Sequence, residues 1–300
     1  MTYLITGATG FIGRSLVESL LADGHSVNYL SRKIDRSMNL RAAFHHWEDP
    51  ETTLPPLTSV PRCDAVIHLA GEPVAQRWTE EVKRKIRDSR VAGTRNLIEA
   101  IGLMRHKPSV LVSSSAVGYY GDRGDEVLTE ESKPGKDFLA EVCVEWEREA
   151  LRATELGLRV VPIRTGVVLA SGGGALQKML PPFQFGIGGR FGNGKQWTPW
   201  IHRDDLLRLF RFAAETQSVD GPMNGTAPEP VTNSEFTRTL ARAIHRPALL
   251  PIPKFGLRLL LGEMADFLVE SIRAVPAAAE RQGFSFTYSH LQSALNAVLR

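Results

Sequence analysis

The chain has few cysteines and little net charge, and each shortage excludes a class of protein. Its 300 residues include two cysteines, Cys63 and Cys143, which are far apart and belong to no metal-binding motif. A disulfide framework is therefore not expected, and neither is a metal site. The formal net charge is +3, which is too small to indicate a nucleic-acid surface. We expect no nucleic-acid partner.

Long hydrophobic runs are also missing. The most apolar stretch, residues 255–261, is too short to cross a bilayer and contains Arg258. The sequence begins directly with a strand-like run at Tyr3, which leaves no room for a signal peptide. These features predict a cytoplasmic protein with no membrane partner. The hydrophobic fraction of 43% is nevertheless ample for the core of a globular enzyme.

What the chain does contain is a glycine-rich turn near its N-terminus. A strand-like run, residues 3–6, enters the segment T-G-A-T-G-F-I-G, and a helical pattern follows at residues 15–21. Glycine permits a sharp turn, a close approach of the main chain to a pyrophosphate, and tight packing of the helix on its sheet. Free N–H groups at the start of such a helix attract an anion. The sequence therefore predicts a dinucleotide site that includes Gly7, Thr9, Gly10, Phe11, Ile12 and Gly13.

Strand-like and helical patterns alternate through the first half of the chain. This alternation predicts an α/β fold, a Rossmann-like doubly wound parallel sheet that binds its ligand at the carboxyl ends of the strands. The alternation breaks down near Gly172. We expect an NADP-binding domain at residues 1–170, to which part of residues 195–222 returns, and a smaller, discontinuous substrate lobe in most of residues 171–300. Further strands are expected at residues 26–30, before Trp47, and at residues 64–71, 109–113 and 159–163, with a long helix at 79–101.

The end of the second predicted strand indicates which dinucleotide binds. NAD-binding domains usually place a carboxylate there, which would repel a 2′-phosphate. This chain has Ser31-Arg32-Lys33 instead, and a hydroxyl next to a guanidinium suits a phosphate. The sequence therefore predicts NADP(H). Other expected cofactor contacts are Trp47 beside the adenine and the main chain of Leu69, Ala70 and Gly71.

The glycine spacing G-x-x-G-x-x-G resembles the opening of the extended short-chain dehydrogenases/reductases, the superfamily of nucleotide-sugar epimerases and dehydratases. The resemblance implies a serine motif at the end of the fifth strand. Ser115 aligns with the catalytic serine, and Ser113 is expected beside the cofactor. It also implies a Tyr-x-x-x-Lys pair on the next helix, in which the tyrosine moves a proton and the lysine lowers its pKa. This pair is absent, because the alignment places Phe138 and Val142 at its two positions.

Tyr119 is the nearest substitute for the missing tyrosine, in a segment one residue longer than the superfamily's usual form. The alternative for Tyr119 is simple packing within its loop. Lys133, Lys136 and Glu141 are weaker candidates. Arg90 stands where relatives have the asparagine of an Asn-Val-x-Gly-Thr pattern. A buried arginine needs an anionic partner, and we expect this to be the cofactor pyrophosphate or Glu72.

Several motifs together resemble the YfcH-type family, an atypical branch generally described as sugar-nucleotide epimerases. They are L-A-G-E-P at 69–73, G-Y-Y-G-D at 118–122, R-T-G-V-V-L at 164–169 and P-W-I-H-x-x-D at 199–205. The resemblance runs from Tyr3 to about Ala297 and implies cofactor contacts from Arg164 and Val168. In the substrate lobe, Trp197 and Trp200 are expected either to stack on a base or sugar, or to pack the lobe. Asp205 is expected to cap the helix at residues 206–214.

Two functions are compatible with this pattern. The first is an NADP(H)-dependent epimerase or carbonyl/hydroxyl oxidoreductase that acts, as a monomer or homodimer, on a small polar or nucleotide-linked substrate. Ser115 would polarise the carbonyl, and Tyr119 or a water would handle the proton. The second is a catalytically silent NADP(H)-sensing or scaffold protein linked to cell division. The missing Tyr-Lys pair favours the second function, whereas the serine motif and the substrate lobe favour the first.

Overall fold

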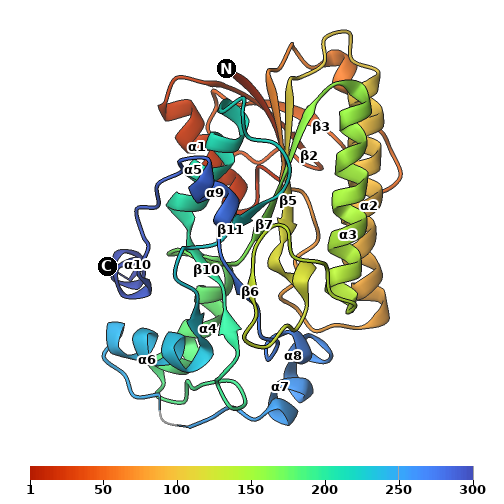
Figure 1. Ribbon diagram of the computed structural model, residues 1–300. Helices are drawn as coiled ribbons and strands as arrows, with labels where there is room; N and C mark the ends of the chain where they lie inside the picture. Colours follow the sequence, from red (N-terminus) through yellow and green to blue (C-terminus); the bar gives the residue numbers. More distant parts are fainter. Residues whose placement is uncertain (249, 300) are drawn as a thin grey trace.

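A seven-stranded parallel sheet forms the centre of the computed structural model, which describes residues 1–248 and 250–299 (Figure 1). Its strand order is β11-β7-β5-β4-β1-β2-β3. The chain builds β1, β2 and β3 outward and then crosses to the other side of β1 to form β4. Doubly wound sheets bind their ligands at such a reversal. The strands are β1 (Thr2–Thr6), β2 (Ser26–Ser31), β3 (Ala43–His46), β4 (Ala65–His68), β5 (Val110–Ala116), β7 (Arg159–Thr165) and β11 (Met223–Gly225).

The predicted Rossmann-like doubly wound fold is confirmed. One strand of the sheet was not expected from the sequence, namely β11, which pairs in parallel with β7 at the sheet edge. The chain reaches this edge from the region expected to hold the substrate lobe. The predicted helix at residues 79–101 is α2 (Glu80–Gly102), and it begins where the Thr79 side chain accepts the N–H of Val82.

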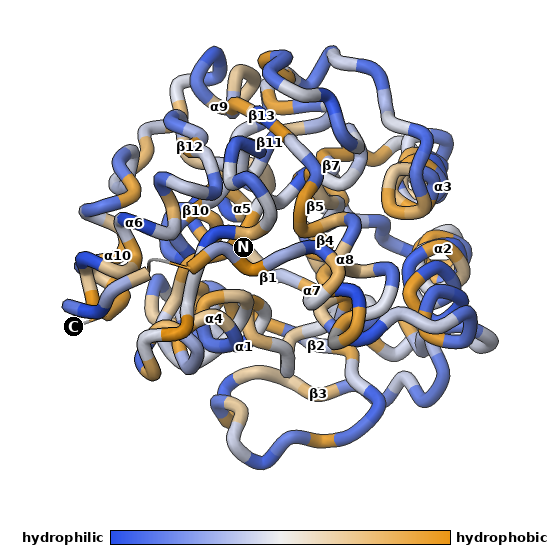
Figure 2. The backbone as a smooth tube through the Cα atoms, turned by 90° about the horizontal axis from the view of Figure 1, so that it is seen from below, coloured by the Kyte–Doolittle hydropathy of each residue, from blue (hydrophilic) through white to orange (hydrophobic). Residues whose placement is uncertain are grey.

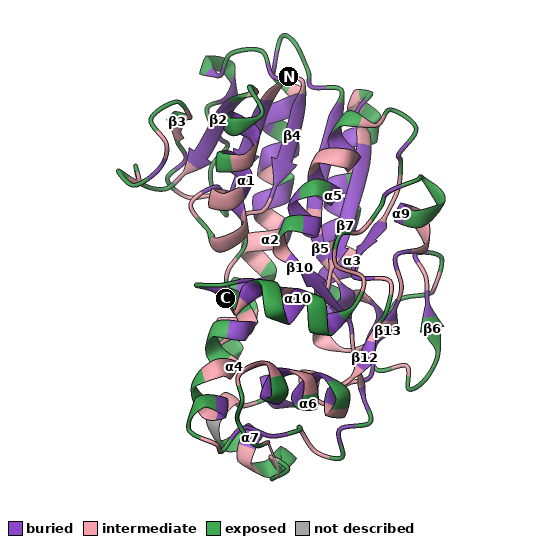
Figure 3. Cartoon of the chain, turned by 90° about the vertical axis from the view of Figure 1, so that its left-hand side faces the viewer, coloured by how far each residue is buried: buried purple, intermediate pink, exposed green. Residues whose placement is uncertain are grey.

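Helices cover both faces of the sheet. On one face lie α2 and α3 (Phe138–Leu151), whose N-cap is Asp137. On the other lie α1 (Phe11–Ala22) and α5 (Arg203–Glu215). Viewed from below, the outer turns of α2 are mostly hydrophilic (Figure 2). The central strands are buried on both sides (Figure 3).

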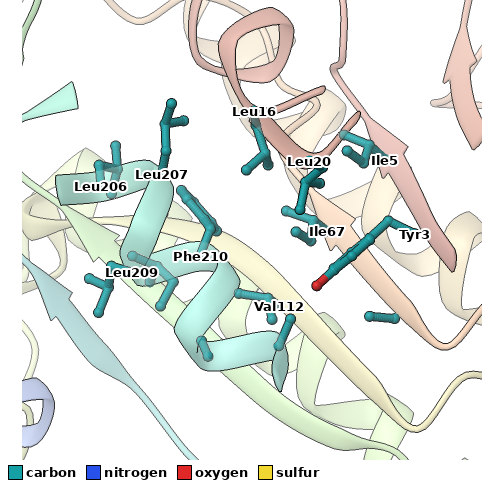
Figure 4. Packing of buried hydrophobic residues seen from close by; sticks show 14 of the residues in the cluster. Tyr3, Ile5, Leu16, Leu20, Ile67, Val112, Leu206, Leu207, Leu209 and Phe210 are labelled. Atoms are coloured by element: carbon teal, nitrogen blue, oxygen red, sulfur yellow. The ribbon is translucent and has the colours of Figure 1, made fainter. Parts of the chain in front are cut away.

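Hydrophobic side chains from α1, α5 and the sheet interdigitate to form the largest core cluster (Figure 4). Leu16 and Leu20 of α1 and Phe210 of α5 lie against side chains of the sheet, including Ile5 and Ile67. Each fully buried side chain of this size contributes about 1.5–3 kcal/mol of transfer free energy. This packing fixes α1, and therefore the glycine turn that precedes it, against the carboxyl edge of the sheet.

The second lobe lies at the opposite end of the molecule from the N-terminus (Figures 1 and 3). Its core is formed by residues of α4, α6 and α10. The C-terminal return segment, which contains Ala279 and Phe284, instead packs in the core of the sheet domain.

None of the described helices is long and apolar enough to cross a bilayer. The remaining helices are α4 (Gly174–Gln184), α6 (Asn233–Ala243), α7 (Lys254–Leu261), α8 (Met264–Phe267), α9 (Ala277–Arg281) and α10 (Leu291–Val298). The short strands are β6 (Val127–Leu128), β8 (Val167–Leu169), β9 (Trp197–Thr198), β10 (Trp200–His202), β12 (Val231–Thr232) and β13 (Arg273–Ala274).

The expected capping role of Asp205 is wrong. The N-cap of α5 is His202, whose side chain accepts the N–H of Asp204. Asp205 lies in the first turn and is completely buried, and its carboxylate accepts the N–H groups of Thr287 and Tyr288 at 3.0 and 2.8 Å. Asp205 therefore fastens the C-terminal return segment to the sheet domain.

Candidate functional site

A cavity of about 310 Å³ opens at the carboxyl ends of β1, β2, β3 and β4, at the reversal of the strand order. Four segments predicted to bind the cofactor contribute to its lining, so residues that are far apart in the sequence meet at one site. Among the lining residues are Gly7, Thr9, Gly10, Ser31, Arg32, Trp47, Leu69, Ala70, Gly71 and Glu72.

The glycine turn has the geometry that a pyrophosphate cradle requires. Gly7 has a φ of +68°, which L-residues rarely adopt. A Cβ on Gly13 would lie 2.2 Å from the carbonyl oxygen of Gly7, so only glycine fits there. Helix α1 has no side-chain N-cap and no acidic residue in its first turn. Its first N–H groups are therefore free to bind an anion.

A buried polar chain supports the floor of the cavity. The Thr6 hydroxyl lies 2.6 Å from Nδ1 of His68, and Nε2 of the same ring lies 2.9 Å from the hydroxyl of Thr94. Burial lowers the pKa of His68 to about 4, so the ring is neutral at physiological pH. These hydrogen bonds connect β1, β4 and α2 beneath the segments that are predicted to bind the cofactor. They could not be predicted from the sequence, because a single histidine in a hydrophobic strand has no recognisable partner.

The end of the cavity near β2 contains one positively charged side chain, Arg32. Arg32 is exposed and forms no ion pair with any described residue, and the neighbouring Ser31 is half-buried. On the other side, Trp47 is buried and donates its indole N–H to the carbonyl oxygen of Thr53. Trp47 thus presents a fixed apolar wall beside a cationic rim.

Arg90, on α2, lies next to Gly71 and Glu72 of the cavity lining. Its guanidinium donates to the main-chain oxygens of Glu72 and Ile86 at 2.9 and 3.1 Å and lies over the ring of Trp146. It also lies against Gly71, where a Cβ would be 3.2 Å from its Cζ. The suggested ion pair with the Glu72 carboxylate is wrong, because that carboxylate accepts from Gln76 instead. Among the described residues, Arg90 has no carboxylate partner.

Ser115 belongs to a buried ion-pair network. Its hydroxyl donates to Oε1 of Glu147 at 2.6 Å, and both carboxylate oxygens of Glu147 accept from Arg164 at 2.9 Å. Arg164 also donates to the Tyr120 hydroxyl and to the carbonyl oxygen of Glu130. The side chains of Glu147 and Arg164 are 8% and 3% exposed, so the charges compensate each other out of contact with water.

This network changes two sequence-based assignments. Ser115 is 4% exposed and its only hydroxyl proton is directed to Glu147, which argues against a role in polarising a substrate carbonyl. Arg164 uses four of its roughly five N–H donors inside the protein, which argues against the cofactor contact that the resemblance implied. We revise both to positioning residues. Ser113, also fully buried, directs its hydroxyl to the carbonyl oxygen of Ser114.

Helix α3 confirms that no Tyr-Lys pair faces the end of β5, although its register differs from the expected one. Phe138 packs on Trp78, with ring centroids 5.4 Å apart. Leu139 contacts Gly118, which follows β5, and Cys143 lies one turn later beside Ala116 at the end of β5, in line with Glu147. Burial raises the pKa of the Cys143 thiol to about 12, so it remains neutral.

Tyr119 lies on the exposed side of the same network. Its ring stacks on the guanidinium of Arg164, with Cζ 3.5 Å from the ring centroid, and meets the ring of Tyr120 edge-on. Burial raises the pKa of the Tyr119 phenol, although Arg164 opposes this shift. The phenol therefore keeps its proton at neutral pH. It is half-buried, whereas Tyr120 is fully buried.

The other predicted residues divide between the cavity edge and the core. Ile12, Leu69 and Val168 are half-buried and pack on the core cluster at the carboxyl edge of the sheet. Phe11 covers the glycines that precede α4, where a Cβ on Gly173 would lie 2.2 Å from its ring. Trp200 has the packing role, because it is fully buried and donates to the carbonyl oxygen of Glu229. Trp197 is half-buried beneath Arg273.

Comparison with known proteins identifies the family of the chain. Residues 3–224 match the model of the NAD dependent epimerase/dehydratase family, and residues 252–298 match a domain of unknown function, DUF1731. The chain is 42% identical to the chloroplastic SDR39U1 homolog of Arabidopsis thaliana, an epimerase family protein, over all of this chain and 87% of that protein. It is 39% identical to the epimerase family protein YfhF of Bacillus subtilis, over all of this chain and 98% of that protein.

Solved structures show the same relationship. The human epimerase family protein SDR39U1, crystallised with NADPH, superposes with a TM-score of 0.88 at 32% identity over 99% of both chains. A UDP-glucuronic acid 4-epimerase from Bacillus cereus shares the fold, with a TM-score of 0.78 at 19% identity over 99% of this chain and 98% of that one. The chain therefore belongs to the NAD dependent epimerase/dehydratase family.

Proposed function

We propose that the protein binds NADP(H) and uses it as an epimerase or a carbonyl/hydroxyl oxidoreductase on a small polar or nucleotide-linked substrate. One observation carries the proposal: a glycine cradle, the free N–H groups of α1 and Arg32 meet at one cavity, and Arg90 lies against Gly71 of its lining. Neither arginine has a carboxylate partner among the described residues. These groups fit a dinucleotide with a pyrophosphate and a 2′-phosphate. The human relative crystallised with NADPH supports the same cofactor.

Each part of the cavity has a role in holding the cofactor. The glycine turn and Arg90 would neutralise the pyrophosphate, Trp47 would flank the adenine, and Ser31 and Arg32 would grip the 2′-phosphate. The bound cofactor supplies a hydride acceptor or donor. Residues 171–300 would form most of the substrate lobe, consistent with the separate hydrophobic core of α4, α6 and α10.

We assign the role of proton donor to Tyr119. Its phenol is protonated at neutral pH and half-exposed, and the Arg164 guanidinium fixes its ring. A protonated phenol can donate to a developing alkoxide. Ser115 acts indirectly, because it binds Glu147, which holds Arg164 beneath Tyr119.

Replacing Arg32 with aspartate tests the cofactor assignment. The wild-type protein is expected to bind NADPH at least about tenfold more tightly than NADH, a difference of about 1.4 kcal/mol. Arg32→Asp should abolish or invert this preference, because the new carboxylate repels the 2′-phosphate. Fluorescence titration of both dinucleotides measures the effect, and Lys33→Asp is the matched control one residue away. Equal wild-type affinities for NADPH and NADH would contradict the assignment.

Replacing Tyr119 with phenylalanine tests the proton donor. Tyr119→Phe keeps the ring on Arg164 but removes the acid, so kcat should fall by about 10²-fold while the Kd for NADPH is unchanged. NADPH oxidation against a panel of carbonyl compounds and nucleotide sugars provides the assay. Tyr120→Phe, which removes a buried hydroxyl bonded to Asn224, should affect stability rather than kcat. A Tyr119→Phe enzyme with full activity would rule out the phenol.

The second candidate function is an NADP(H)-sensing or scaffold protein without turnover. The observation in its favour is the helix α3, where Leu139 and the neutral Cys143 replace the acid/base pair beside β5. Tight NADPH binding with no oxidation across the panel would favour this function over the enzyme.

A further inference from the structure

The loop after β2, which begins with the residues proposed to bind the 2′-phosphate, also contains an acidic residue. Asp35 follows Ser31 and Arg32 in this loop, and its side chain is 28% exposed. Its Oδ1 accepts the hydroxyl and the N–H of Ser37 at 2.6 and 2.9 Å. These hydrogen bonds, followed by the contact with Arg14, hold the pKa of Asp35 below its usual range. The carboxylate is therefore ionised at neutral pH, in a loop where the cofactor needs positive charge.

Arg14 reaches Asp35 from helix α1. It lies in the first turn of α1, directly after the glycine cradle. One guanidinium nitrogen forms an ion pair with Oδ2 of Asp35, and the other donates to the Ser37 hydroxyl at 2.6 Å. Thr9 and Gly10 line one side of the cavity, and Ser31 and Arg32 line the other. The Arg14–Asp35 pair thus joins the two chain segments that supply these walls.

We infer that Arg14 is a specificity-determining residue that preserves the preference for NADP(H) by neutralising Asp35. The inference rests on the proposed function. A free carboxylate in this loop would repel a 2′-phosphate and favour the unphosphorylated ribose of NAD(H). The Debye length is about 8 Å at physiological ionic strength, so an ionised carboxylate in the same loop acts across water on a phosphate bound within that range. Arg14 removes this repulsion while leaving Arg32, which has no carboxylate partner among the described residues, available to the phosphate.

A double-mutant cycle on Arg14 and Asp35 tests the inference. Arg14→Met keeps most of the side-chain length and exposes the Asp35 charge. It should raise the Kd for NADPH about tenfold and that for NADH less than about twofold. Asp35→Asn alone should leave NADPH binding as tight as wild type or tighter. The double variant should return to within about threefold of the wild-type Kd for NADPH, because no carboxylate remains to be neutralised.

Arg36→Met is the matched control, because this exposed arginine of the same loop forms no ion pair with a described residue. Its effect on NADPH binding should be under about threefold and should be unchanged by Asp35→Asn. Three results would overturn the inference: a double variant as weak as Arg14→Met, an equal loss for NADH, or an Arg36→Met effect as large as that of Arg14→Met. If the wild-type protein binds neither dinucleotide, the proposed function itself is contradicted. This outcome can be distinguished from the other three, which contradict only the role of Arg14.

Discussion

Glu147→Ala is expected to destabilise the fold by about 3–5 kcal/mol, because it leaves the Arg164 guanidinium buried without its counter-ion. The loss also removes the acceptor of the Ser115 hydroxyl, which has no other partner among the described residues. Chemical denaturation followed by tryptophan fluorescence measures the change. The effect should appear in the free energy of unfolding rather than in the m-value, because the folded and unfolded surfaces are unchanged.

Two further variants distinguish the loss of the buried ion pair from a general effect of removing charge from α3. Glu145→Ala removes a carboxylate two residues away that pairs with the half-exposed Arg87, and it should cost less than about 1 kcal/mol. Glu147→Leu combined with Arg164→Met should cost less than the sum of the two single changes, since no unpaired charge remains. Strict additivity would mean that the two side chains do not depend on each other.

Most of the sheet could be predicted because each of its main strands is a short hydrophobic run followed by a turn or helix signal. The strand β11 could not be found in this way. It has three residues, one of them Asn224 and one Gly225, and neither favours a strand. Its place depends on pairing with β7 and on the bond from the Asn224 N–H to the Glu130 carboxylate. Both partners are distant in the sequence.

The candidate site likewise has one part that could be predicted from the sequence and one part that could not. The cofactor half could be predicted because main-chain geometry limits which residues fit, as the contact between Gly13 and Gly7 shows. The catalytic half depends on how side chains pair across elements. Glu147 looks like an ordinary helix-surface carboxylate until α3 is placed against β5, and this placement alone reveals that Ser115 and Arg164 are both engaged. Sequence alignment identified Ser115 but could not show where its proton is directed.

Arg90→Met is expected to weaken NADPH binding by about 1–3 kcal/mol, which corresponds to a Kd roughly 5- to 150-fold higher. The methionine keeps apolar contact with Trp146, over which the guanidinium now lies, so the change removes the charge with little loss of packing. The apoprotein should lose little stability, because Arg90 has no carboxylate partner among the described residues and its two hydrogen bonds are to main-chain oxygens, those of Glu72 and Ile86.

The ionic strength dependence identifies the partner of Arg90. If its guanidinium neutralises the pyrophosphate, the difference between wild type and Arg90→Met should shrink as salt is added, because salt screens the attraction between the two charges. Arg95→Met on the same helix, whose partner is the Glu149 carboxylate, should leave the Kd unchanged at every salt concentration. NADPH and NADH should lose affinity equally in Arg90→Met, since both carry the pyrophosphate, whereas Arg32→Asp acts on NADPH alone. A loss confined to NADPH would place Arg90 at the 2′-phosphate, on the opposite side of the adenine ribose from the position inferred here.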